Sequence, residues 1–271
     1  MTDCYYRRLP ADGQEPTASW GLFDSTDGTR SNWDPDIQHG SPPLALLTKA
    51  IEELASATAG HPTLRIARLG LDILGAIPVA PVRVRAWVSR PGSRIAMMTA
   101  EMSAASRLDR AVARVTAWLM APSDTHDVTV DRYPPLVEGE PDPVQHDWVG
   151  APGYLQTVSW RRQTAADGDA AVVWLSPLVA LVDDEPTTPV QRLAMVVDCA
   201  NGAGATLDPG RFLFMNTDTV VHLHRVPTGS DFALRARASI GPDGIGETSA
   251  EIFDRQGFIG TSAQALLVQR R

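Results

Sequence analysis

The stretch Pro189–Ala200, PVQRLAMVVDCA, decides the fold, together with the runs that follow it. Apolar residues recur in it at the spacing i, i+3, i+4 and i+7, at Leu193, Val196, Val197 and Ala200. This spacing puts them on one face and predicts a single amphipathic helix over the whole stretch. Asn201 and Gly202 follow directly and supply a helix end.

Runs with the composition of β-strands follow this helix, at Phe212–Arg225, Phe232–Ile240, Gly246–Phe253 and Phe258–Val268. Turn sequences separate the last three runs, GPDG at 241–244 and DRQG at 254–257. Strands joined by such short turns pair in the antiparallel sense. The second half therefore predicts one helix followed by an antiparallel sheet.

The first half repeats this order about 150 residues earlier, with Val84–Ala86 aligned against Leu234–Ala236. Its helix is expected over Pro42–Ala57, with Ser41 as the N-cap and prolines in the first turn. Its strands are expected at Leu64–Leu74, Val82–Trp87, Ile95–Ala105 and Ala111–Met120. One helix and four strands, twice, predict two α+β units in which each sheet covers its own helix.

A linker separates the two units in this interpretation. Ala121–Gln145 holds five prolines and several acids without a sustained apolar period, which is typical of linkers. An unstructured stretch of this length is uncommon within one compact domain. The sequence thus predicts a first unit over residues 1–121, a linker over 122–147 and a second unit over 148–271.

Composition narrows the class of protein. The 271 residues carry a net charge of −8, which argues against a nucleic-acid or anionic-lipid surface. The longest apolar run, Ala171–Val182, contains Ser176 and Pro177 and falls short of the ~20 residues that span a bilayer. The first residues lack the features of a signal peptide, and Cys4 and Cys199 are too few for a disulfide framework. A soluble cytoplasmic protein is expected.

Motifs in a fixed order resemble those of a known family: Trp33–Gly40 (WDPDIQHG), Met195–Asp198 (MVVD), Asn216–Arg225 (NTDTVVHLHR) and Gly257–Gln264 (GFIGTSAQ). In this order, they are similar to four parts of the acyl-CoA thioesterase II family and its thioesterase-like relatives. These parts are the entrance of the first helix, the second helix, a strand ending in His-Arg and the closing strand. The resemblance covers about residues 20–271. It implies a double hot-dog fold, two helix-wrapped antiparallel sheets in one chain, and hydrolysis of acyl-CoA to fatty acid and CoA.

In the family, an Asp, a hydroxyl-bearing residue and a Gln hold the hydrolytic water. The resemblance assigns these catalytic roles by position to Asp198, Asn216 and Gln264. Asn216 departs from the pattern, which has a hydroxyl at this position. An amide can orient water but is not a base. The residues alone leave other interpretations open: helix acids are mostly exposed, and an amide in an apolar run can be purely structural.

Substrate contacts are expected from His39 and Gly40, since a helix N-terminus offers free N–H groups to a carbonyl oxygen or a phosphate, and from Thr217. A turn glycine and a capping histidine are the alternative for the first two. The acyl chain is expected between the second helix and its sheet. The resemblance implies an acyl-CoA substrate, no cofactor, no metal, no nucleic-acid or membrane partner, and a homo-oligomer.

Two other functions fit the same residues. A non-catalytic acyl-CoA or lipid binder is suggested by the departure at Asn216, because a fold does not fix a function. A hydratase or dehydratase would need an Asp/His or Asn/His pair, for which His222 or His224 are the candidates. These two histidines also have a spacing that can bind zinc, but further ligands are required, and an outward polar strand face explains them more simply.

Overall fold

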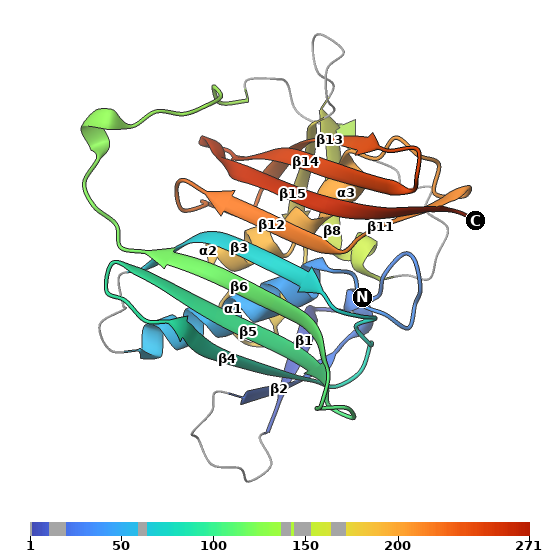
Figure 1. Ribbon diagram of the computed structural model, residues 1–271, viewed down its shortest axis with the longest axis horizontal. Coiled ribbons are helices and arrows are strands. Elements are labelled where there is room, and N and C mark those ends of the chain that lie inside the picture. Colours follow the sequence, from blue (N-terminus) through green and yellow to red (C-terminus); the bar gives the residue numbers. More distant parts are fainter. Residues whose placement is uncertain (1, 11–19, 59–63, 137–141, 144–152, 164–171) are drawn as a thin grey trace.

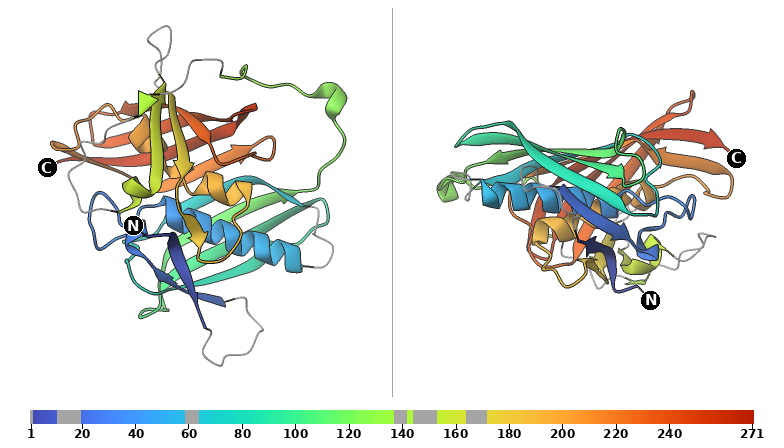
Figure 2. Two further views of the ribbon diagram at one scale, coloured as in Figure 1. Left: turned by 180° about the vertical axis from the view of Figure 1, so that it is seen from behind. Right: turned by 90° about the horizontal axis from the view of Figure 1, so that it is seen from below.

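The computed structural model describes residues 2–10, 20–58, 64–136, 142–143, 153–163 and 172–271. In this part of the chain, one continuous sheet of fifteen strands curves around the helices (Figure 1). Figure 2 shows the long helix α1 (Ser41–Ala57) lying on the concave side of the sheet. No helix in the described ranges is long and apolar enough to cross a membrane.

The two halves of the sheet have the same strand order, mirrored about their junction. The first half runs in the order β1 (Cys4–Leu9), β2 (Trp20–Ser25), β4 (Val82–Arg90), β5 (Ile95–Ala104), β6 (Ala111–Met120) and β3 (Arg65–Ile73). The second half continues with β12 (Asp218–Leu223), β15 (Gly257–Arg270), β14 (Ile245–Asp254), β13 (Phe232–Ile240), β9 (Val172–Pro177) and β8 (Val158–Gln163). The antiparallel pair β3–β12, with Gly70 opposite Val220, joins them.

Three short strands complete the sheet. β10 (Ala180–Val182) runs parallel to β1, β7 (Asp142–Pro143) pairs with β8, and β11 (Phe212–Asn216) pairs with β15. Because β1 lies beside β10, the start of the chain is packed against its second half. Four short 3-10 helices lie between the other elements: η1 (Asp27–Thr29), η2 (His126–Val128), η3 (Tyr154–Thr157) and η4 (Val197–Cys199).

The expected strands after each helix are present, but six further strands were missed: β1, β2, β7, β8, β9 and β10. In β9 the residues Val172, Val173, Trp174 and Leu175 are all buried. Both faces of β9 are covered, so its sequence is a continuous apolar run without the alternation that marks a half-buried strand.

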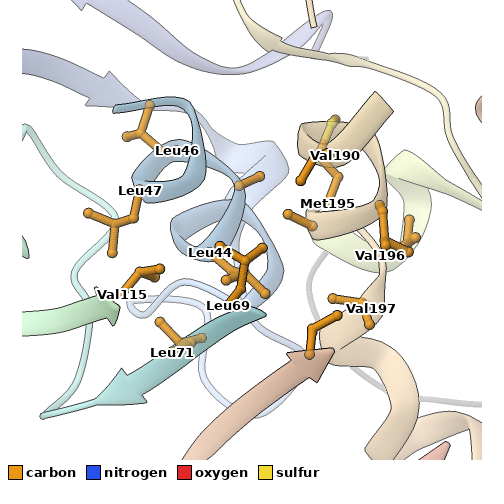
Figure 3. Packing of buried hydrophobic residues seen from close by; sticks show 14 of the residues in the cluster. Leu44, Leu46, Leu47, Leu69, Leu71, Val115, Val190, Met195, Val196 and Val197 are labelled. Atoms are coloured by element: carbon orange, nitrogen blue, oxygen red, sulfur yellow. The ribbon is translucent and has the colours of Figure 1, made fainter. Parts of the chain in front are cut away.

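Helix α1 is buried on most of its circumference rather than on one stripe. The strands β4, β5 and β6 pack on one side of it, and α2 (Pro189–Ala194) packs on the other. Figure 3 shows Leu44, Leu46 and Leu47 of α1 among side chains from both neighbours. The expected N-cap was wrong by one residue: Gly40 is the N-cap, and Ser41 is the buried first residue of the helix.

The single helix expected over Pro189–Ala200 is wrong. Helix α2 ends at Ala194, Val196 leaves the helical region with φ −133°, and η4 leads into α3 (Ala200–Ala203). Asn201 and Gly202 lie inside α3, which is capped by Gly204. Two adjacent β-branched residues, Val196 and Val197, lower the helix propensity at the break.

The strand expected over Phe212–Arg225 is two strands. β11 ends at Asn216, Thr217 interrupts the ladder, and β12 begins at Asp218. Both strands pair with β15, so the sheet continues across the interruption. The break changes which side chains point inward, and this decides the composition of the site described below.

The expected linker is described over residues 121–136 and 142–143. Residues 122–132 are exposed and contain the short turn η2, and residues 142–143 form β7. Tyr133 and Leu136 then pack on the outer face of the second half of the sheet, against Phe253 and Phe258. Residues 137–141 and 144–152, which include the expected boundary at 147/148, lie outside the described residues.

Candidate functional site

Asp198 is the centre of the site. It lies on η4, in the break of the second helix, and only 3% of its surface is exposed. The solvent-facing interpretation of this acid is therefore wrong. A carboxylate at such a depth must be held by donors, and Asp198 receives them from three strands of the neighbouring sheet, β11, β12 and β15.

Three side chains donate to the same oxygen of this carboxylate, Oδ1. Asn216 at the end of β11 donates through Nδ2 at 2.7 Å, and Thr219 on β12 donates its hydroxyl proton. Gln264 on β15 donates through Nε2 at 3.2 Å, and also donates to the Asp198 carbonyl at 3.0 Å and to Thr219 Oγ1 at 2.8 Å. The structure thus brings the three residues expected to be catalytic together at one carboxylate.

Thr219 was missed by the sequence analysis. The break at Thr217 lets Asn216 and Thr219 both contact Asp198, although uninterrupted alternation would place residues three apart on opposite faces. The hydroxyl absent at Asn216 is therefore supplied three residues later. Alternation counted back from the buried Val221 places Thr219 on the inner face, and this is the signal that could have found it.

The second oxygen, Oδ2, lies on the side of the first half of the chain. His39 Nδ1 is 3.6 Å from it. The backbone N–H of Ser41 donates to the same Nδ1 at 3.1 Å, so the imidazole carries its proton on Nε2. Burial lowers the pKa of His39, and the Asp198 charge opposes this only in part. His39 is neutral at pH 7, with an N–H to donate.

Gly40 also touches Oδ2. A Cβ atom added at Gly40 would lie 2.5 Å from this oxygen, so only a residue without a side chain fits. In the first turn of α1, Ser41 N–H is used by His39, Leu44 N–H donates to the Gly40 carbonyl, and the two prolines carry none. Among the described residues, no hydrogen bond uses the Gly40 N–H.

A cavity of about 900 Å³ opens beside Asp198. Its apolar wall includes Trp33, Ile77, Leu155, Trp160, Val173 and Met215, and its polar wall includes His39, Asp198, Asn216, Thr217, Arg162 and Arg271. It thus extends past η4 and α3 to the loops that precede α1 and follow β3. A cavity of this size and mixed lining is typical of small-molecule sites.

The other expected residues take different places. Thr217 lies on the cavity wall but is itself exposed. His222 is exposed on β12, and His224 bonds to the Phe258 carbonyl at 2.9 Å and lies 3.4 Å from Asp131. Neither histidine lies on the cavity wall. Within the described ranges, no cluster of three or more His, Cys, Asp or Glu side chains could hold a metal.

Two protein-family models match the sequence along most of its length. Residues 29–120 match the model of the acyl-CoA thioesterase N-terminal domain, and residues 130–268 match that of the acyl-CoA thioesterase C-terminal domain. No curated protein matches the sequence. The residues between the two matches, 121–129, lie in the exposed segment that follows β6.

Solved structures share the fold at low sequence identity. A candidate thioesterase from Novosphingobium aromaticivorans superposes with a TM-score of 0.71 at 14% identity, covering 94% of this chain and 99% of the other. A hot-dog protein of unknown function from Alicyclobacillus acidocaldarius gives 0.70 at 15%, covering 96% and 95%. Acyl-CoA thioesterase II of Mycobacterium marinum gives 0.59 at 11%, covering 92% of each chain. With hot-dog proteins as structural neighbours and both family models matched in order, the chain belongs to the acyl-CoA thioesterase family.

Proposed function

We propose that this protein hydrolyses acyl-CoA thioesters to a free fatty acid and CoA. One observation carries the proposal: the buried carboxylate of Asp198 has its Oδ1 occupied by three donors, while its Oδ2 lies beside His39 and Gly40 on the cavity wall. A carboxylate held in this way presents one oxygen as an acceptor for a reacting water.

In the proposed reaction, Asp198 Oδ2 accepts a proton from a water that attacks the thioester carbonyl carbon. The C–S bond breaks, and the proton on Asp198 passes to the CoA thiolate. The Gly40 N–H, at the positive end of α1, stabilises the oxyanion. The Nε2–H of the neutral His39 is a second donor for that oxygen.

The donors behind Asp198 have distinct roles in this proposal. Asn216 lies on the cavity wall and orients the water directly. The Nε2 group of Gln264 is engaged with Asp198 and Thr219 and holds the carboxylate, while its buried Oε1, which has no hydrogen-bond partner among the described residues, accepts from the water. Thr219 supplies the hydroxyl of the family pattern.

The cavity supports the assignment of the two parts of the substrate. Trp33, Leu155, Trp160 and Val173 offer apolar surface to an acyl chain, and Arg162 and Arg271 offer positive charge to the phosphates of CoA. The acyl chain then lies along the outer part of the cavity as well as beside the second helix.

Thiol release from a panel of acyl-CoAs with C4 to C18 chains tests this proposal. We expect turnover by the wild type and loss of about 10³-fold in kcat for Asp198→Asn, which keeps the shape but removes the base. Asp183→Asn, half exposed on the surface, is the matched control. Full activity of Asp198→Asn would overturn the mechanism, and saturable binding without turnover by the wild type would instead support an acyl-CoA binder.

The His39–Asp198 pair favours a second candidate, hydration of an enoyl-CoA or the reverse dehydration. This chemistry needs a neighbouring acid and base. Asp198 is the base and the Nε2–H of His39, whose Nδ1 lies 3.6 Å from Asp198 Oδ2, is the acid, a pair that His222 and His224 do not form with Asp198. Incubation with an enoyl-CoA separates the two reactions: hydration removes the conjugated double bond without releasing thiol, whereas hydrolysis releases thiol.

For the architecture, we propose a double hot-dog with a first unit over residues 1–121, a linker over 122–147 and a second unit over 148–271. The mirrored strand order and the packing of α1 on β4, β5 and β6 support it. We also propose assembly into homo-oligomers, which light scattering of the purified chain tests.

A further inference from the structure

Tyr154 connects the two sides of the candidate site. It begins η3, outside the helices and strands that carry the residues described above, and its side chain is fully buried. The Tyr154 ring stacks on the imidazole of His39, with centroids 3.9 Å apart and planes 10° apart. Its hydroxyl donates to the backbone carbonyl of Met195 at 2.7 Å.

The Met195 carbonyl matters because it lies at the break of the second helix. In an unbroken helix it would accept from the N–H of Cys199, four residues on. Here the Cys199 N–H donates to the Val196 carbonyl, and the Tyr154 hydroxyl takes its place on Met195. The same hydroxyl lies 3.0 Å from Cys199 Sγ. Tyr154 therefore binds the chain on both sides of Asp198.

The contacts of Tyr154 also reach the loop that carries His39. The Tyr154 N–H donates to the Arg30 carbonyl, and the His39 N–H donates to the Thr29 carbonyl next to it. The broken helix packs beside α1, the helix that His39 and Gly40 precede (Figure 3). One side chain thus touches both segments whose spacing sets the His39–Asp198 distance.

From these contacts we infer that Tyr154 is a positioning residue for the hydrolysis, one that fixes Asp198 through Met195 and fixes His39 through ring stacking. The inference rests on the proposed function. Tyr154 takes no part in proton transfer. Its hydroxyl is committed to Met195, and burial raises its pKa well above the ordinary value for tyrosine.

Two substitutions separate the two contacts. Tyr154→Phe removes the bond to Met195 and keeps the ring on His39, so kcat is expected to fall about tenfold with KM changed less than twofold. Tyr154→Leu removes the stacking as well, so kcat falls further. The pKa of His39, followed by NMR and assigned with His39→Gln, is expected to stay low in Tyr154→Phe and to rise in Tyr154→Leu.

Tyr5→Phe is the matched control. Tyr5 is also fully buried, and its hydroxyl shares a 2.8 Å hydrogen bond with Thr157 Oγ1. Its ring lies 6.0 Å from the ring of Tyr154, a contact that Phe keeps, and among the described residues it makes no hydrogen bond or ring contact with His39 or Asp198. We expect Tyr5→Phe to lower Tm much as Tyr154→Phe does and to keep kcat within twofold. An equal fall of kcat in both variants, or no fall in Tyr154→Phe, would overturn the positioning role.

The NMR measurement keeps this inference separate from the proposed function. If the wild type releases no thiol from any acyl-CoA, the proposed function fails, yet the pKa of His39 in the two Tyr154 variants still tests the stacking contact. An unchanged His39 pKa in Tyr154→Leu would overturn that contact whatever the activity.

Discussion

Gly40 and Asp198, from opposite halves of the chain, approach so closely that a Cβ atom at Gly40 would lie 2.5 Å from Asp198 Oδ2. The glycine backbone is in the right-handed helical region, with φ −67° and ψ −27°, which any residue adopts. The requirement for glycine is therefore steric and comes from the carboxylate alone.

Gly40→Ala is expected to displace the carboxylate. We expect kcat/KM to fall about 100-fold, because a small displacement of a reacting group costs this much. The free energy of unfolding should fall by about 1–3 kcal/mol from overpacking. A double-mutant cycle with Asp198→Ala checks the cause: the cost in stability should largely vanish when the carboxylate is absent. An unchanged cost would place the strain elsewhere.

Thr219→Val tests the hydroxyl that the sequence analysis missed. Valine keeps the shape of threonine and removes one bond to a buried carboxylate, a loss of about 1.5–3 kcal/mol. That corresponds to a fall of kcat by about 10- to 150-fold if the bond is needed in the transition state. Thr219→Ser, which keeps the hydroxyl, should restore most of the activity. Equal activity of the Val and Ser variants would contradict this role.

The repeated order of helix and strands could be predicted from the sequence, because period and turn residues are local signals. The break in the second helix could not. Val196, Val197 and Ala200 are buried on both sides of the break, so their helical spacing persists although the backbone leaves the helix. The bond from Tyr154 to Met195 that accompanies the break joins residues 41 positions apart.

The candidate site also contains some residues that the sequence predicts and others that it does not. Asp198, Asn216 and Gln264 could be named from motif order, since each stands at a fixed place in its motif. Thr219 and the contact of His39 with Asp198 depend on the strand break at Thr217 and on packing between the halves. Alternation within β12 can place Thr219 on the inner face, but neither its meeting with Asn216 at Asp198 nor the His39 contact is encoded in the spacing of residues within one segment.

We predict that protonation of Glu185 lowers the free energy of unfolding at acid pH. Hydrogen bonds from Arg8 oppose the effect of burial, Lys49 adds to them, and together they lower the pKa of Glu185 to about 2 from 4.5. A pKa depressed by folding stabilises the protein above the unfolded value and ceases to do so as the pH falls. This contribution, about 2–3 kcal/mol, is therefore complete above pH ~4.5 and lost toward pH ~2.

Urea unfolding at pH 7 and pH 3 measures this difference in the free energy of unfolding. Glu185→Gln should destabilise the protein at pH 7 and make the difference between the two pH values smaller. Glu53, which also bonds Arg8 but is half exposed, gives the control Glu53→Gln, with an expected cost below about 1 kcal/mol. Equal costs for the two variants would show that burial does not strengthen the Glu185 network.

Ala203 on α3 tests where the acyl chain lies. It is 7% exposed and forms part of the cavity wall. Ala203→Leu would fill space in the 900 Å³ cavity and exclude methylene groups of a long chain. Each excluded methylene costs about 0.8 kcal/mol, or roughly fourfold. We expect kcat/KM to fall about tenfold for C16 and C18 substrates and to stay within about twofold for C4 and C6.

The control is Ala263→Leu, at an exposed position of β15, which should change kcat/KM for neither the long nor the short substrates. A uniform loss over all chain lengths would mean that Ala203→Leu disturbs Asp198 rather than the acyl site, and no change for the long chains would place the acyl group outside this cavity.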